Sequence, residues 1–390
     1  MKPSINRLAI VSGSRADWSL WLPLLAEFNN HPEFEILLVT TGSHYHSLQN
    51  HSLQNIIAAG YSPKAEVIML PKTTTPDDIS VATGKGIQEF TKVWMQLNPT
   101  AILVLGDRYE MFAAATSAYF LNIPLIHLYG GETTAGAWDE GLRHAISHFS
   151  QQHFTAAEPY RQRLIQMGQH PNRIFTVGSL GIDAQKMVDI PSRNSLLKWL
   201  ELPNQTEFLL ITFHPVTKKK DGGIRELKVL LEALIDQKEY LIFTSPHPDA
   251  AGEKIQKIIE DFCFNRQDST KIILNAGNIW YPALLKYAKA ILGNSSSGII
   301  EASNFHTPVL NWGIRQSGRI IPDNVISCTG SKKILLNNIN KLLSADFKQF
   351  CKKTNNPWGD GNSAKKIIHI LKTQIPFKFE PLPFYDLPQT

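Results

Sequence analysis

Cysteine is scarce in this sequence, and the three that occur, Cys263, Cys328 and Cys351, stand far apart. No pair has the C-x-x-C spacing, which excludes a disulfide framework and a zinc knuckle. A low cysteine content is typical of proteins kept in a reducing compartment. We therefore expect a cytoplasmic protein without structural disulfides.

Long hydrophobic runs and concentrated charge are also missing. No apolar run approaches the roughly 18 residues that a membrane span needs, and no signal-peptide core precedes the first apolar run. The net charge is only +5 over 390 residues, with Lys and Arg dispersed along the chain. A duplex-binding protein usually carries a concentrated basic stripe. We expect neither a membrane nor a nucleic-acid partner.

Three familiar motifs are absent as well: the G-x-G-x-x-G fingerprint, the P-loop and the G-x-S-x-G elbow. Their absence argues against a dinucleotide dehydrogenase, a P-loop NTPase and an α/β-hydrolase.

The sequence does contain two series of short apolar runs that alternate with helix-like segments. This alternation predicts an α/β fold with parallel sheets built from right-handed crossovers. The predicted strands are Leu8–Val11, Ile36–Thr40, Val67–Leu70, Ala101–Leu105, Leu125–Leu128, His153–Ala156, Ile174–Val177, Phe208–Phe213, Tyr240–Thr244, Ile272–Leu274, Ala290–Leu292, Val309–Asn311 and Asn324–Ile326.

The alternation pauses at Asp183–Leu202, where we place a domain junction. We expect an N-terminal domain over residues 1–185, joined by a C-terminal helical segment, 364–390. A second domain is expected over 186–363.

Ligands of open α/β sheets bind beyond the carboxyl ends of the strands, so the turns there are the first candidates. After the first strand, Arg15 is suited to bind phosphate, and the alternative is a plain surface residue. Asp17 can cap the helix that follows. His44 follows the second strand, where we expect a polar contact to a ligand. No carboxylate or cysteine stands at metal-ligand spacing from it, so we expect no metal.

Carboxylates gather after the fourth and fifth strands. Asp107 follows Ala101–Leu105, and Glu132 and Asp139 follow the strand that ends near His127. A single such residue is usually a helix cap or a dipole partner. Several carboxylates with Arg143 in one short segment exceed what capping needs. Because carboxylates in one cleft raise each other's pKa, the cluster predicts acid and base catalysis.

The second half carries candidate phosphate contacts. His214 and His247 each stand before a proline after a strand, where they offer an N–H to phosphate or simply belong to stiff turns. In Gly293-Asn-Ser-Ser-Ser-Gly298, Ser295 and Ser296 can donate to a pyrophosphate. Glu301 can accept from two ribose hydroxyls, and Arg315 completes a basic flank.

These motifs, in order along nearly the whole chain, resemble those of the hydrolysing UDP-N-acetylglucosamine 2-epimerases of sialic-acid-type sugar synthesis. The matching segments are Gly13-Ser-Arg-Ala-Asp17, Gly106-Asp-Arg-Tyr-Glu-Met111, Gly130-Gly-Glu132 with Asp139-Glu-Gly-Leu-Arg-His-Ala145, Gly293-Asn-Ser-Ser-Ser-Gly298 and Thr307-Pro-Val309.

The resemblance implies two Rossmann-like domains of the glycosyltransferase-B type, with the active site between them and the C-terminal helix crossing back to the first domain. It implies a UDP-sugar substrate, no metal or redox cofactor, and a reaction in which a base removes the C2 proton as UDP leaves C1. Water then adds to the glycal. By motif position, Asp107, Glu132 and Asp139 are the candidates for catalysis. Contacts to UDP or sugar fall to Arg15, His44, Arg143, His214, His247, Ser295, Ser296, Glu301 and Arg315. We also expect a homo-oligomer, a dimer or a tetramer.

One position departs from part of that family. Some members have a catalytic Glu two residues after the strand-end His, where this chain has Tyr129. Other bacterial members, including those that act on UDP-N,N'-diacetylbacillosamine on the route to legionaminic acid, also lack an acid there. Tyr129 and Trp138 can help to pack such a less polar sugar. The substrate is therefore this sugar nucleotide or UDP-N-acetylglucosamine, with a slight preference for the former.

Two other interpretations stay open. A glycosyltransferase of the same fold would use the UDP site but would need an acceptor groove where the carboxylates stand. A non-catalytic nucleotide-sugar sensor would bind a UDP-sugar without releasing UDP.

Overall fold

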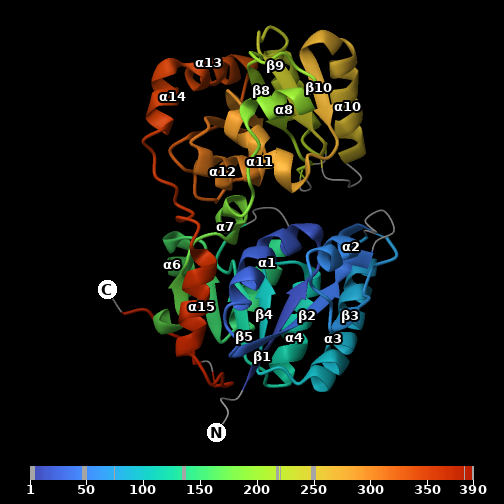
Figure 1. The fold of residues 1–390 in the computed structure, drawn as a ribbon, viewed down its shortest axis with the longest axis vertical. Coiled ribbons are helices and arrows are strands. Elements are labelled where there is room, and N and C mark those ends of the chain that lie inside the picture. The colour runs from blue at the N-terminus through green and yellow to red at the C-terminus, as the bar shows by residue number, and fades with distance from the viewer. Residues whose placement is uncertain are drawn as a thin grey trace. The chain divides into compact units, whose positions relative to one another are not determined.

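The computed structural model describes residues 5–45, 51–73, 75–133, 138–216, 219, 221–246, 252–381 and 383–388. Two parallel sheets organise these residues, one of seven strands in the order β3-β2-β1-β4-β5-β6-β7 and one of six in the order β10-β9-β8-β11-β12-β13 (Figure 1). Each sheet reverses its strand order once, beside β1 in the first and beside β8 in the second. The arrangement is that of two Rossmann-like domains of the glycosyltransferase-B type.

Each of the thirteen predicted strands overlaps an observed one, so the predicted fold class is confirmed. The strands are β1 Asn6–Ser12, β2 Phe34–Thr41, β3 Ala65–Val67, β4 Ala101–Leu105, β5 Leu125–Leu128, β6 Gln152–Thr155, β7 Ile174–Thr176, β8 Phe208–Thr212, β9 Tyr240–Thr244, β10 Thr270–Ile273, β11 Ala290–Gly293, β12 Val309–Trp312 and β13 Val325–Cys328. The edge strand β3 shares only Val67 with the predicted Val67–Leu70, because the residues that pair with Val39–Thr41 of β2 are Ala65–Val67; the prediction for 68–70 is wrong.

Helices connect these strands. They are α1 Arg15–Phe28, α2 His51–Ala58, α3 Pro76–Leu97, α4 Tyr109–Phe120, α5 Asp139–Phe149, α6 Glu158–Gln166, α7 Leu180–Lys186, α8 Arg193–Trp199, α9 Ile224–Leu234, α10 Gly252–Phe264, α11 Gly277–Tyr287, α12 Ser296–Ile300, α13 Lys332–Leu343, α14 Ala345–Cys351 and α15 Ser363–Thr373, with short 3-10 turns that include η1 Gly42–Tyr45. None of the helices in the described ranges is long and apolar enough to cross a membrane.

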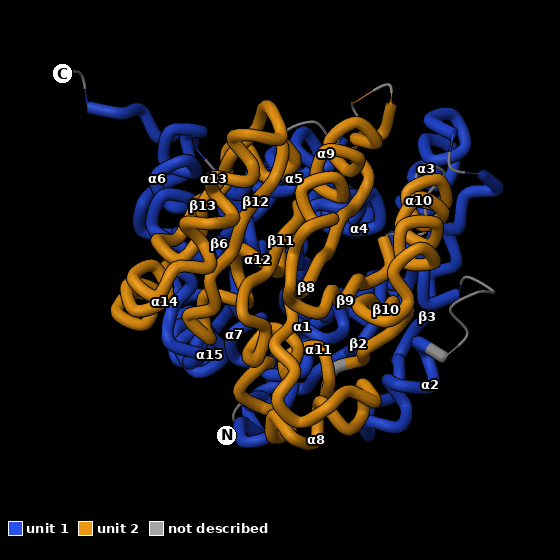
Figure 2. The backbone as a smooth tube through the Cα atoms, turned by 90° about the horizontal axis from the view of Figure 1, so that it is seen from above, with its two compact units in different colours: residues 1–133, 138–184, 358–390 blue, residues 134–137, 185–357 orange. Residues whose placement is uncertain are grey.

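The chain divides into two compact units (Figure 2). The N-terminal unit contains residues 1–133, 138–184 and 358–390, and the C-terminal unit contains 134–137 and 185–357. Helix α15 thus belongs to the N-terminal unit, where it packs beside α1. Its first backbone amides, those of Ser363 and Ala364, donate to the Asp183 carboxylate over 3.1 and 2.8 Å. A side chain of α7 thereby satisfies the otherwise unpaired start of α15.

The first sheet is buried on both faces, as its near-continuous apolar strands require. In β1, Leu8 and Ile10 face a core shared with α1 and α15, whereas Ala9 and Val11 face a core shared with α3, α4 and α5. Successive strand residues point to opposite faces, so one run fills both layers. In the second sheet, residues of β8, β9, β11 and β12 pack against α9, α10 and α13. These rigid layers hold the loops at the carboxyl ends of the strands.

Candidate active site

Three carboxylate-bearing segments of the N-terminal unit meet at a buried arginine. Arg143 of α5 is 4% exposed. Its guanidinium forms an ion pair with Asp107, in the turn after β4. It also donates to the Tyr129 carbonyl over 2.8 Å, and lies 3.7 Å from the Glu132 carboxylate. The structure therefore brings together Asp107, Glu132 and Arg143 as the sequence predicted.

The Glu132 carboxylate is held at the site with one oxygen unused. The residue is 5% exposed, and its Oε1 atom is buried without a hydrogen-bond partner among the described residues. A buried carboxylate oxygen without a partner has lost its hydration, and no hydrogen bond within the protein compensates for that loss. Such an atom is well placed to take a proton from a ligand or to accept a hydrogen bond from a ligand hydroxyl.

Asp139 stands at the first position of α5, one turn before Arg143. Burial raises its pKa to about 6, the Asp107 carboxylate adds to the rise, and Arg108 and Arg143 oppose it. Asp139 thus exists in both protonation states near neutral pH, as a proton-transfer residue requires. The effect of the Asp107 carboxylate on the pKa of Asp139 shows that Asp139 lies within electrostatic range of Asp107.

Tyr129 occupies an unusual backbone conformation, with φ of 65°. A side chain in this left-handed region is strained, and the surrounding structure must hold it there. The Arg143 bond to the Tyr129 carbonyl and a 3.1 Å bond between the Tyr129 and Ser179 hydroxyls do so. The Tyr129 ring packs against the core that contains Val177 and Leu180. Trp138, the other residue proposed to pack a sugar, is 61% exposed.

The turn after β1 lies against the turn after β2. Asp17 accepts from the Gly13 amide over 3.0 Å and its own amide donates to Ser14, so Asp17 stabilises the start of α1. Burial raises the pKa of Asp17 to about 6. Arg15 is exposed at the first position of α1.

His44 is buried, and both of its ring nitrogens are already engaged. They lie 2.9 Å from the Ser12 hydroxyl and 2.7 Å from the Ser52 hydroxyl. Burial, with Arg108 nearby, lowers the pKa of His44 to about 4. A contact from His44 to a ligand would require one of these hydrogen bonds to be exchanged.

Glu110, which was not among the predicted site residues, is fully buried on α4. Its two oxygens accept from the Nε and Nη2 atoms of Arg108 over 3.0 and 2.8 Å. Arg108 in turn acts electrostatically on Asp17 and Asp139. The sequence signal for this ion pair was an Arg and a Glu two residues apart in Gly106-Asp-Arg-Tyr-Glu, where a helix was expected to begin.

In the C-terminal unit, Asn294 ties together the turns that follow two adjacent strands. Its side chain accepts from the His214 amide over 2.7 Å and donates to the His214 carbonyl over 2.8 Å. The Asn294 carbonyl accepts from Arg315 and Gln316 over 3.1 and 2.9 Å. His214 and Arg315, both predicted contacts, are thus fixed around one residue that sequence reasoning left out.

The three serines after Asn294 differ in their hydrogen bonds. Ser295 caps α12, and its hydroxyl lies 2.9 Å from that of Ser297. The Ser297 hydroxyl also contacts the hydroxyl of Tyr281 at 2.5 Å. Ser296, half-buried between them, makes no side-chain hydrogen bond to any described residue. Its hydroxyl is therefore available to a ligand.

Glu301, at the end of α12, also has a side chain without a hydrogen bond or ion pair to any described residue. Burial raises its pKa to about 7. Donors that bind the ionised carboxylate would compensate for the lost hydration, and a pair of vicinal hydroxyls supplies two of them.

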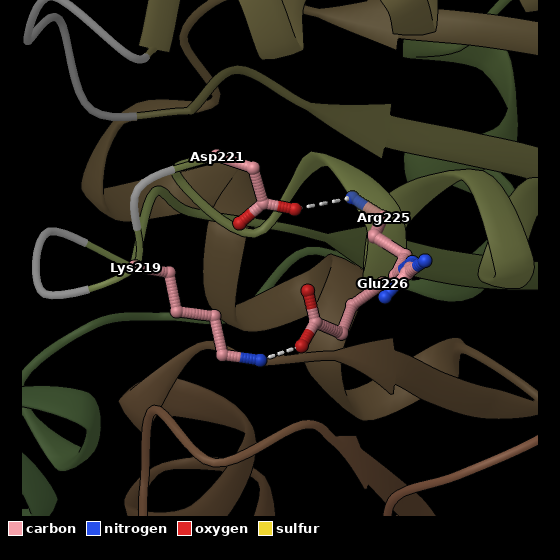
Figure 3. Close-up of a pocket in the computed structure, with 4 residues that line it drawn as sticks. All are labelled: Lys219, Asp221, Arg225 and Glu226. Carbon is pink, nitrogen blue, oxygen red and sulfur yellow. Dashed lines mark hydrogen bonds and ion pairs between the residues drawn. The ribbon is translucent and has the colours of Figure 1, made fainter.

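One further cavity of the C-terminal unit, of about 490 Å³, lies at the start of α9 (Figure 3). Lys219 and Glu226 pair across it, and the Asp221 carboxylate accepts from the Gly223 and Arg225 amides. Lys219, Asp221 and one Glu226 oxygen are engaged, whereas the Glu226 Oε2 atom is buried without a partner among the described residues. We assign this cavity no ligand. The predicted contact His247 lies outside the described residues. Within the described ranges, no three His, Cys, Asp or Glu side chains are grouped as metal ligands would be.

Comparisons with known proteins agree on one family. The family model described as UDP-N-acetylglucosamine 2-epimerase matches residues 26–372. The chain is 36% identical to a GDP/UDP-N,N'-diacetylbacillosamine 2-epimerase (hydrolyzing) of Campylobacter jejuni, over 89% of this chain and 90% of that protein. It is 31% identical to the UDP-N,N'-diacetylbacillosamine 2-epimerase (hydrolyzing) of Legionella pneumophila, over 95% and 96%.

The fold is also that of a solved structure, the UDP-GlcNAc 2-epimerase of Neisseria meningitidis bound to UDP-GlcNAc. The TM-score is 0.78 at 19% identity, and the match covers 94% of this chain and 100% of that one.

Proposed function

Because the chain belongs to the UDP-N-acetylglucosamine 2-epimerase family, we propose that its N-terminal carboxylates eliminate UDP from a UDP-linked 2-acetamido sugar and then hydrate the product. The chain is an enzyme of the hydrolysing UDP-sugar 2-epimerase type. The observation that carries the assignment of roles is the meeting of Asp107 and Glu132 at Arg143, with Asp139 within electrostatic range of Asp107.

The proposed reaction has two steps. A carboxylate takes the proton at C2, the C2–H electron pair forms the C1–C2 double bond, and the C1–O bond to the diphosphate breaks as UDP leaves. In the second step the oxygen of water bonds to C1, and a proton returns to C2 on the opposite face. The products are UDP and a free sugar epimerised at C2.

The properties of the carboxylates suit these proton transfers. Asp139, whose pKa lies about 6, can give and take a proton near neutral pH. Glu132 offers a buried oxygen without a protein partner. Asp107 is held in place by its ion pair with Arg143, as a positioned catalytic group requires.

In the C-terminal unit we propose that Ser295, Ser296 and His214 contact the diphosphate, with Arg315 beside them and Glu301 on the ribose. The support is local. The Ser296 hydroxyl and the Glu301 carboxylate lack side-chain partners among the described residues, and Asn294 holds the His214 and Arg315 segments together. Arg15 of the N-terminal unit, exposed at a helix start, is a further candidate phosphate contact.

We propose UDP-N,N'-diacetylbacillosamine as the preferred substrate and UDP-N-acetylglucosamine as the alternative. Support comes from the names of the two relatives at 36% and 31% identity. The first name also includes a GDP-linked sugar. The test therefore offers the purified protein both UDP-sugars and the GDP-linked diacetylbacillosamine, without any acceptor, and follows nucleotide release.

Release from one sugar nucleotide without an acceptor supports the epimerase assignment and names the substrate. Release only when an acceptor is added would favour a glycosyltransferase, and binding without release would favour a sensor. Two variants test the division of roles. Ser296→Ala should raise KM strongly with kcat nearly unchanged, whereas Asp107→Asn should mainly lower kcat.

A further inference from the structure

A fully buried histidine lies directly beneath the carboxylate cluster. His127 is the third residue of β5 and is 0% exposed. Its Nε2 atom lies 2.7 Å from the Gly106 carbonyl, and its Nδ1 atom lies 3.0 Å from the Ser147 hydroxyl. A carbonyl oxygen only accepts, so Nε2 carries the proton and donates it to Gly106. Nδ1 then accepts from Ser147.

The two hydrogen-bond partners of His127 lie on two of the segments that carry the proposed catalytic carboxylates. Gly106 directly precedes Asp107. Ser147 lies on the same face of α5 as Asp139 and Arg143, because the three residues are spaced by four along the helix.

The third segment is the loop that leads to Glu132, which crosses the His127–Ser147 pair at Gly130. A Cβ on Gly130 would lie 3.0 Å from the Ser147 hydroxyl and 3.1 Å from the His127 Nδ1 atom. A side chain at this position would have to push the Ser147 hydroxyl or the His127 ring back by a few tenths of an ångström, so glycine fits best here. One imidazole thus contacts the strand-end turn, the loop and the helix.

The charge state of His127 is fixed along with its position. Burial lowers its pKa to about 3, and nearby His153, Arg143 and His144 disfavour a second proton, while the Gly106 carbonyl favours it. The ring is therefore neutral at any working pH, and it is fully buried, with no surface open to a ligand. Its contribution is to hold backbone and helix in place.

We propose that His127 is a positioning residue for the epimerase reaction, setting the relative placement of Asp107, Glu132 and Asp139 through Gly106, Gly130 and Ser147. This inference rests on the catalytic role proposed for those carboxylates. A displacement of about 1 Å between reacting groups can lower a rate roughly 100-fold. Loss of the His127 hydrogen bonds should therefore lower kcat and leave the Kd for the nucleotide unchanged.

The test compares His127→Phe with His127→Gln and with a matched control, His153→Phe. Phenylalanine cannot donate to Gly106, whereas the glutamine amide can reach the place of Nε2. His153 is an equally buried imidazole on the next strand, with its Nε2 atom 3.2 Å from Gln169 and a pKa that burial also lowers, to about 4. We expect His127→Phe to lower kcat about 100-fold with an unchanged Kd for UDP. His127→Gln should recover at least about tenfold of that loss, and His153→Phe should stay near wild type.

Equal kcat losses in the two phenylalanine variants, or an unchanged kcat in His127→Phe, would overturn the proposal. If His127→Phe does not fold, Ser147→Ala removes only the hydroxyl that faces Nδ1 and should still lower kcat with UDP binding intact. Nitrogen-15 NMR of the imidazole gives a readout that needs no turnover, and a proton on Nδ1 instead of Nε2 would contradict the geometry. A wild-type protein that turns over no sugar nucleotide but shows the Nε2–H form would refute the proposed function and leave the hydrogen-bond assignment standing.

Discussion

Arg143 of helix α5 forms an ion pair with Asp107 of the turn after β4, and the two side chains are 5% and 18% exposed. The same guanidinium reaches the Tyr129 carbonyl, so one arginine joins segments that start from two different strands. Such a shielded pair is costly to form and more costly to break, because removing one partner leaves the other charge without compensation.

Arg143→Met should therefore be both inactive and unstable. We expect a loss of about 3 kcal/mol in the free energy of unfolding, together with a large fall in kcat. Denaturant unfolding and steady-state kinetics measure the two effects. The control is Lys92→Met, which removes the exposed ion pair to Glu89 and should cost less than about 1 kcal/mol. Similar losses in both variants would contradict a special role for the buried pair.

Asp139→Asn should lose activity and gain stability at high pH. The folded state raises the pKa of Asp139 from 3.8 to about 6, so the folded protein holds this proton more tightly than the unfolded chain does. The ionised group therefore destabilises the fold as the pH rises from about 4 through 6. The variant should have a higher Tm than the wild type at pH 8, with a smaller difference at pH 5. A Tm difference that does not change with pH would show that Asp139 is not buried as described.

Glu301 should make nucleotide binding depend on pH. Its pKa is about 7 in the free protein, and ribose hydroxyls would bind the ionised form. Affinity should thus be full above pH 7 and fall by up to about tenfold for each pH unit below it. The measurement is calorimetric titration of the Asp107→Asn variant, whose low kcat prevents turnover. The ligand is UDP-N-acetylglucosamine, which, unlike UDP, has no terminal phosphate that titrates in this pH range. Adding Glu301→Gln should abolish the pH dependence, and a persisting dependence would assign it to another group.

Gly293 should tolerate no side chain. Its φ is 135°, and a Cβ there would lie 1.9 Å from the Thr212 carbonyl of the neighbouring strand β8. Gly293→Ala should lower the free energy of unfolding by more than about 2 kcal/mol and weaken UDP binding, because Asn294 follows directly. Gly84→Ala on α3 is the matched control. Among the described residues no atom would meet its Cβ within 4 Å, and alanine favours the helix by up to about 1 kcal/mol. Destabilisation by Gly84→Ala of the same size would refute the steric argument.

The strands and the turns after them could be predicted from the sequence, because a short continuous apolar run indicates a strand buried on both faces. The runs at Ala101–Leu105 and Phe208–Phe213 gave strands that the structure contains, and the turns after them carry Asp107 and His214. What the sequence could not supply is pairing across the fold. Nothing in the order of residues shows that His127 contacts Gly106 and Ser147, or that Asn294 holds His214, since these contacts depend on which strands lie side by side.

Tyr129 illustrates a second limit. The sequence suggested that its ring packs a sugar, whereas the structure engages its hydroxyl with Ser179 and its ring with the core. The positive φ of Tyr129, which directs the ring there, could not be predicted, because tyrosine rarely adopts this backbone conformation. The homo-oligomer and the cytoplasmic location stay predictions.

In the proposed reaction UDP leaves by elimination across C1 and C2, and proton NMR of the reaction in D2O tests this step most directly. The wild-type protein is incubated with UDP-N,N'-diacetylbacillosamine and, separately, with UDP-N-acetylglucosamine. We expect UDP and a free 2-epimer that carries deuterium at C2, because the proton returned to that carbon comes from solvent. Release of UDP with the original hydrogen retained at C2, or with the configuration at C2 unchanged, would contradict it.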